Sequence, residues 1–229
     1  MASITEIEEG LKDWELLKEL PQELCGFRLI PGTGIKGQIL NIAAYVNDEK
    51  HCRLDLTYTT ETFDYVPVQT IGLHVFRDER YFSRDRERFG DMLQQHIPSI
   101  LETMLREGHH EESYEAMALG FPQWEYWRSL PEKLGSYERF ITPENPLVYL
   151  NGSTIFLDYT DFEHGNQLYF SYNSFRNDIF AEMKQHYQPF TTELFDVPGA
   201  IADEKKLAHL EKLLSKNLES TLKELSSKD

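Results

Sequence analysis

The spacing of hydrophobic residues changes its period along this chain. Residues 3–20 carry an apolar stripe that repeats every three or four positions, which is typical of an amphipathic helix. The stripe consists of Ile4, Ile7, Leu11 and Trp14. Ser3 and Glu6 have the spacing of a capping box, and Pro21 cannot continue a helix because it lacks an amide hydrogen. The pattern therefore predicts an N-terminal helix.

Between residues 27 and 76 the period becomes two. Residues 52–59 alternate apolar and polar side chains, which predicts a strand with one face in the core. Residues 38–46 and 71–75 show the same tendency. Because these candidate strands are short and close together in sequence, an antiparallel meander is favoured.

The helical period returns over residues 85–107, where Pro98 predicts that the helix kinks or splits near His96. In the second half we predict strands at 147–159 and 167–172, and a helix from about residue 174 to 187. Residues 203–226 place leucine every three or four positions and predict a C-terminal amphipathic helix.

The fold class predicted from these elements is α+β, with one or two antiparallel sheets packed against two main helices and further amphipathic helices at the termini. We treat residues 1–229 as a single unit. Its subregions are strands plus helix at 22–107, an irregular connector at 108–146, a hairpin plus helix at 147–187 and the C-terminal helix at 200–229. Both halves contain strands followed by a helix, but without visible residue-level similarity we favour one fold over a duplicated unit.

Charge narrows the classes of partner. The chain has 39 Asp and Glu against 23 Lys and Arg, a formal net charge of -16. Nucleic acid and anionic membranes bind concentrated positive charge, so neither is expected as a partner. No uncharged apolar run reaches the roughly 18 residues that span a bilayer. The N-terminal residues do not resemble a signal peptide, so we expect a cytoplasmic protein with Cys25 and Cys52 reduced.

Two motifs invite a cofactor or metal interpretation, and neither has the required context. Gly32, Gly34 and Gly37 match the glycine pattern of a phosphate-binding loop, but a strand follows them where a dinucleotide fingerprint requires a helix. His109, His110, Glu111 and Glu112 carry metal-capable side chains, but adjacent residues diverge and do not converge on one ion. We therefore expect a turn and a loop, with no cofactor and no metal.

An aromatic cluster is the first candidate binding site. Trp124, Tyr126 and Trp127 stand close together within the expected connector. If exposed, they could stack on a sugar or anchor a protein partner. If buried, they seal the core, and this is the alternative that their size favours.

The second candidate site is a group of polar residues around one predicted hairpin. Asp158, Asp161, Glu163 and His164 could form an acid–base pair or bind a hard cation. The alternative places Asp158 on the wet face of a strand, because inward charges are rare.

The sequence shows no catalytic signature, so our leading hypothesis is a non-catalytic interaction or regulatory protein. Its acidity suits a protein partner with a basic surface, because complementary fields accelerate association. We expect the C-terminal helix to be an attachment element outside the central core, which either docks on its own domain or pairs with a second copy in a homodimer. The alternative is a hydrolase-like enzyme whose site is assembled from dispersed Asp, Glu, His and Tyr residues.

Overall fold

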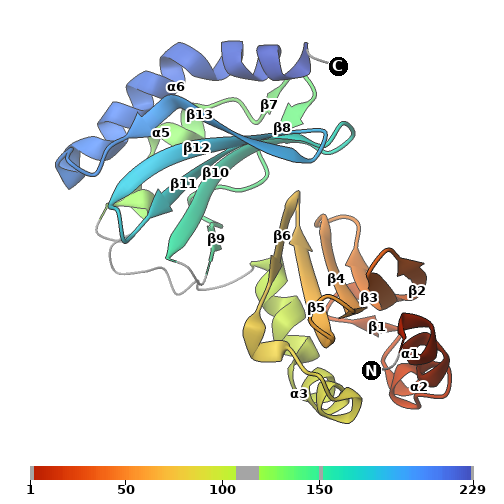
Figure 1. The fold of residues 1–229 in the computed structure, drawn as a ribbon. Coiled ribbons are helices and arrows are strands. Elements are labelled where there is room, and N and C mark those ends of the chain that lie inside the picture. The colour runs from red at the N-terminus through yellow and green to blue at the C-terminus, as the bar shows by residue number, and fades with distance from the viewer. Residues whose placement is uncertain (1–2, 107–118, 150–151, 228–229) are drawn as a thin grey trace. The chain divides into compact units, whose positions relative to one another are not determined.

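The structure, a computed structural model, describes residues 3–106, 119–149 and 152–227 (Figure 1). The chain divides into two compact units, Met1–Glu107 and Gly108–Asp229, where we predicted one. Each unit contains its own antiparallel sheet with helices, so the mixed α+β class is confirmed. The two units are described separately below.

The first unit begins with two short helices, continues as an antiparallel meander and ends in a long helix. Its sheet has the strand order β1-β2-β3-β4-β5-β6, so every strand pairs with its neighbour in sequence. The elements are α1 (Ile4–Leu11), α2 (Leu16–Glu19), β1 (Glu23–Leu24), β2 (Phe27–Lys36), β3 (Ile39–Asn47), β4 (Cys52–Thr59), β5 (Asp64–Ile71), β6 (His74–Arg77), η1 (Glu79–Tyr81) and α3 (Arg86–Leu105).

Local sequence signals explain where these helices begin. Ser3 and Glu6 form the predicted capping box, in which the Ser3 hydroxyl accepts from the Glu6 amide at 3.2 Å. Asp85 caps α3 by accepting from the Arg88 amide at 2.8 Å. The helix continues through Pro98 without being divided. The expected N-terminal helix over 3–20 is divided into α1 and α2.

The core of the first unit lies between α3 and one face of the sheet. Buried side chains follow α3 at helical spacing and alternate along β4 from Cys52 to Leu56, as the two periods predicted, whereas β3 buries Ala43, Ala44 and Tyr45 in succession. Phe89, Leu93, Tyr45, Leu54 and Leu56 are all fully buried. The glycine motif forms a turn only in part. Gly32 and Gly34 lie within β2, where the pairing with β3 shifts register, and Gly37, with a φ of +62°, lies in the turn between the two strands.

The second unit has the same general plan. Its sheet has the order β7-β8-β10-β11-β12-β13, and the short β9 pairs with β10. The elements are η2 (Phe121–Gln123), α5 (Tyr126–Ser129), β7 (Lys133–Leu134), β8 (Tyr137–Glu138), β9 (Leu147–Val148), β10 (Ser153–Asp161), β11 (Asn166–Asn173), β12 (Asp178–Gln185), β13 (Gln188–Val197) and α6 (Asp203–Ser226).

Two predictions for this half were wrong. The helix expected at 174–187 is a four-residue turn followed by strand β12, in which Ile179, Ala181 and Met183 are buried on one face. The apolar residues here fit both periods, but Phe175 is 83% exposed, which removes the first position of the supposed helical stripe. The described part of the expected connector 108–146 supplies η2, α5, β7 and β8 to the second unit.

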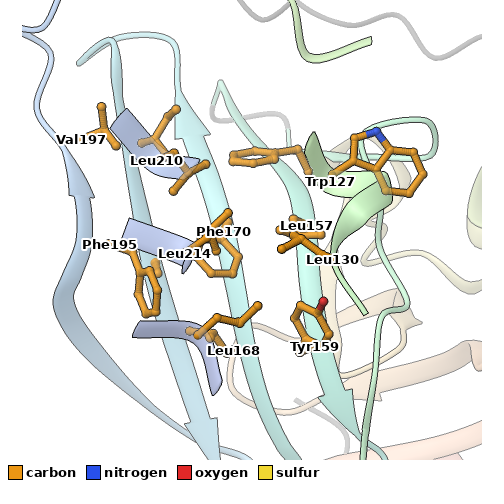
Figure 2. Close-up of a cluster of buried hydrophobic side chains, with 14 of the residues drawn as sticks. Trp127, Leu130, Leu157, Tyr159, Leu168, Phe170, Phe195, Val197, Leu210 and Leu214 are labelled. Carbon is orange, nitrogen blue, oxygen red and sulfur yellow. The ribbon is translucent and has the colours of Figure 1, made fainter. Parts of the chain in front are cut away.

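The long C-terminal helix belongs to the core of its own unit. Leu210 and Leu214 of α6 pack against Phe170 and Phe195 of the sheet, whose rings meet edge to face at 5.1 Å (Figure 2). We expected α6 to be an attachment element outside the core, and this was wrong. Its leucine face is already covered within the unit.

Candidate functional site

The aromatic cluster predicted as a binding patch lies in the core of the second unit. Trp124 and Trp127 are each only 5% exposed. The Trp124 indole Nε1 donates to Glu211 Oε1 of α6 at 2.9 Å. Tyr126 is half-buried, and its ring stacks on that of Trp124 with centroids 6.1 Å apart. These residues therefore fix α5 and the segment before it to the long helix.

Arg139 completes this arrangement from the other side. Its guanidinium lies 4.9 Å from the ring of Trp127, and it donates to the backbone carbonyls of Trp127 and Leu130 at 2.7 and 2.8 Å. The guanidinium provides hydrogen-bond donors for carbonyl groups at the C-terminal end of α5, and its positive charge interacts favourably with the negative end of the helix dipole. The cluster is accounted for by folding, so it offers no exposed platform for a ligand.

Asp158 is fully buried on β10, at a position where its strand faces away from α6. Its carboxyl group accepts from the amides of Phe140 and Ile141 at 3.0 and 2.6 Å. It also accepts from Thr160 Oγ1 at 3.0 Å and from Gln167 Nε2 at 2.9 Å. Asp158, which the alternative interpretation placed on the solvent-exposed face of its strand, is thus the centre of a buried group of hydrogen bonds.

The reason lies in the interruption of the neighbouring strand. Between β8 and β9 the chain leaves the sheet, so the amides of Phe140 and Ile141 donate to a side chain on β10. Buried amides must find acceptors, and Asp158 provides them. Because its oxygens are occupied by four donors, this carboxyl group is poorly placed to act as a general base.

Asp161 is the last residue of β10, and Glu163 and His164 lie in the turn that leads to β11. Asp161 Oδ1 accepts from the amides of Glu163 and His164, both at 3.1 Å, and Oδ2 lies 2.9 Å from His164 Nδ1. Burial opposes ionisation of Asp161, but hydrogen bonds from Ser136 and His164 outweigh it and lower its pKa. These contacts shape the turn, and Glu163 is exposed.

The face of the second sheet directed away from α6, which we call the open face, also carries Tyr169, Glu182 and Lys184. The Lys184 ammonium lies 5.4 Å from the ring centre of Tyr169. Burial lowers the pKa of Lys184 to about 8, although Asp158 and Glu182 both oppose this shift. Burial and the neighbouring Glu182 raise the pKa of Tyr169. This face therefore holds charge in partly desolvated surroundings.

Next to these residues, the open face contains a groove of about 490 Å³ between β12 and β13, here called the acidic groove. Four carboxylates line it, together with one arginine and the ring of Phe180. Its lining is Arg176, Asp178, Ile179, Phe180, Ala181, Glu182, Thr191, Thr192, Glu193, Asp196, Val197 and Pro198. Sequence reasoning missed this groove because it assigned the residues of β12 to a helix.

Electrostatics within the acidic groove are unbalanced. Burial raises the pKa of Asp196, and the negative charges of Glu193 and Asp178 raise it further. Arg176 provides a partial counter-charge, since its Nε lies 3.1 Å from Asp178 Oδ2. An additional cation in the groove would relieve the repulsion that raises the pKa of Asp196.

The remaining candidates can be assessed only in part. Among the described residues, no three His, Cys, Asp or Glu side chains are grouped so that they could hold a metal ion. The motif from His109 to Glu112 lies outside those residues. No helix in the described part of the chain has the length and apolarity needed to cross a membrane. No family model, curated protein or solved structure matches this sequence.

Proposed function

We propose that this protein is a non-catalytic interaction module that binds a basic protein segment in the acidic groove. The supporting observation is the excess of carboxylates in that groove: Asp178, Glu182, Glu193 and Asp196 face one arginine. The whole chain carries a formal charge of -16, which would steer a basic partner towards it.

The groove already contains an example of how it would hold a guanidinium. Arg176 lies 4.9 Å from the ring centre of Phe180 and pairs with Asp178. A partner's arginine would find the same two elements, an aromatic face and a carboxylate, with Glu193 and Asp196 as further acceptors. Exposed ion pairs contribute about 0–1 kcal/mol each, so we expect weak, salt-sensitive binding.

The alternative function is enzymatic, and one observation favours it. Lys184, with its pKa lowered to about 8, resembles a lysine prepared for nucleophilic or general-base chemistry. Its neighbour Asp158 is engaged by two backbone amides, Thr160 and Gln167, so the obvious acid–base partner has a structural role. We therefore place the interaction module first and a hydrolase-like activity second.

Fluorescence anisotropy with a labelled oligo-arginine peptide would test the first proposal on the full chain. The test variant is Glu193→Gln with Asp196→Asn, and its charge-matched control is Glu132→Gln with Glu163→Gln, two exposed residues outside the groove. We expect the test variant to bind several-fold more weakly than the control, with the difference shrinking as salt rises from about 0.01 M to 0.1 M. Equal binding by the two variants would refute the groove as the site.

A further inference from the structure

We infer that the two units are copies of one fold joined in tandem, and that the open face of the second copy has diverged to make the acidic groove. The assignment of groove residues rests on the proposed function, whereas the duplication stands on the sequence and geometry of the two units and does not depend on that function. In both units a short helical turn leads into a two-residue strand, a meander of matching order and a long final helix. Thus β1 to β6 correspond to β7, β8, β10, β11, β12 and β13.

The match begins at the level of sequence. Residues 14–24 and 124–134 share the pattern W-E-x-x-K/R-x-L-P-x-x-L without a gap. The hairpin that follows has the same register in both units. Leu24 pairs with Phe27 and Leu134 with Tyr137. This segment lay in the supposed connector, which is why the repeat was missed.

A buried hydrogen bond is duplicated as well. The hydroxyl of Tyr45 donates to the carbonyl of Pro21 at 3.0 Å, and that of Tyr159 donates to the carbonyl of Pro131 at 2.7 Å. Both tyrosines are 0% exposed. Each stands at the same position of the corresponding strand, opposite Leu54 in one unit and Leu168 in the other.

Irregularities of the strands coincide too. The pairing of β3 with β4 shifts register between Asn41 and Ala43, and that of β10 with β11 shifts between Ile155 and Leu157. Counting from the tyrosine of each unit, these are the same positions. A β-bulge inserts a residue at one defined place, and the general plan of a meander does not require that place to recur.

The turns after these strands also agree. Four residues link β3 to β4 and β10 to β11, and the last of them, His51 or Gly165, has a positive φ. Residue Asn47 accepts from the Lys50 amide at 2.9 Å, and Asp161 accepts from the His164 amide at 3.1 Å. The role of Asp161 as a turn former is therefore matched in the first unit.

Six buried side chains of each final helix stand at identical intervals, and α6 buries Lys206 in addition. In α3 these positions are Phe89, Leu93, Ile97, Ile100, Leu101 and Met104. In α6 they are Leu210, Leu214, Leu218, Thr221, Leu222 and Leu225. The residue that follows Phe89 or Leu210 lies against the equivalent tryptophan in both units. A Cβ on Gly90 would lie 3.1 Å from Trp14, and the Glu211 carboxylate accepts a hydrogen bond from the Trp124 indole.

The two copies differ most on the open face. Val66 and Val68 of β5 occupy the positions that Phe180 and Glu182 hold on β12. The edge strand differs as well, because β6 has 4 residues and β13 has 10, and the residues added to β13 form one wall of the groove. The first unit shows that the fold accepts valine here, so folding does not require the aromatic ring and the carboxylate.

Exchange of equivalent segments within the full chain tests the duplication. In one chimera residues 207–226 replace 86–105, and in its control residues 205–224 do so, two positions out of register. We expect hydrogen–deuterium exchange to show protected β3 and β4 amides in the first chimera and loss of protection in the second. Equal protection in both chimeras would overturn the inference. If both chimeras lose protection, a third chimera decides, in which residues 47–51 and 161–165 are swapped. Unfolding of this third chimera would overturn the inference.

A second substitution tests the diverged site. Phe180→Val with Glu182→Val gives the second unit the residues of the first, and Lys184→Thr is the matched exchange outside the groove. We expect both variants to keep cooperative unfolding, and only the first to lose several-fold in oligo-arginine affinity. Unfolding of the first variant would overturn the equivalence of positions, and unchanged affinity would overturn the residue assignment. If the wild-type chain does not bind the peptide, the proposed function is contradicted. The duplication is then tested by the segment chimeras alone.

Discussion

Replacement of Asp158 is the sharpest test of whether the buried polar centre of the second unit supports the fold or serves chemistry. Its carboxyl group accepts from two backbone amides and from the side chains of Thr160 and Gln167. In Asp158→Ala, Gln167 retains an acceptor, because its Nε2 also donates to Thr160 Oγ1 at 2.9 Å. The Thr160 hydroxyl can rotate to redirect its hydrogen. The backbone fixes the direction of the Phe140 and Ile141 amides, so these two donors lose their acceptor.

The expected magnitude follows from these two amides. A buried donor without an acceptor costs about 1–3 kcal/mol, so Asp158→Ala should lower the free energy of unfolding of the second unit by about 2–6 kcal/mol. Asp158→Asn keeps an oxygen for both amides but turns an NH₂ group towards Gln167. One mismatched donor should cost about 1–3 kcal/mol. The order of stability is therefore wild type, then Asn, then Ala.

Urea denaturation followed by tryptophan fluorescence measures this order, because Trp124 and Trp127 lie in the affected unit. Glu163→Ala is the control, since an exposed residue in the same hairpin should change stability by less than about 0.5 kcal/mol. A cost for Asp158→Ala no larger than that of the control would refute the structural role. A catalytic role for Asp158 would then gain support, and with it the hydrolase-like alternative.

Two further predictions concern the core and the groove. Leu93→Ala, at a fully buried site in α3, should cost about 2–5 kcal/mol and lower the melting temperature of the first unit, and an unchanged melting curve would contradict its place in that core. Arg176→Ala should strengthen oligo-arginine binding several-fold, because it frees Asp178 and the ring of Phe180, and weaker binding in an anisotropy titration would argue that Arg176 supports the groove instead.

The sequence predicted those elements whose period had only one interpretation. The alternation from Cys52 to Thr59 gave β4, and the stripe after Asp85 gave α3. Residues 174–187 fit two periods, and a single sequence offers no measure of exposure that would have separated them. Burial shows that Phe175 lies outside the core and that Ile179 lies within it.

The candidate site was harder to predict because it depends on pairing between strands. Asp158 was selected for its apolar neighbours, but its role arises from the amides of Phe140 and Ile141, which are distant in sequence. The acidic groove combines β12 with β13, so its carboxylates are separated along the chain. The repeat beginning at Trp14 and Trp124 was present in the sequence and needed only an alignment of the chain with itself.

The duplication provides an internal standard for separating folding from function. Some positions keep the same side chain in both units because the shared fold uses it. Tyr45 and Tyr159 are examples, since each donates its hydroxyl hydrogen to the carbonyl of the equivalent proline. Positions that change from valine to glutamate or phenylalanine are not needed for that shared fold. If a partner binds this chain, its contacts should therefore be sought where the copies differ, and the open face beside β13 is where a chemical difference and a hollow coincide.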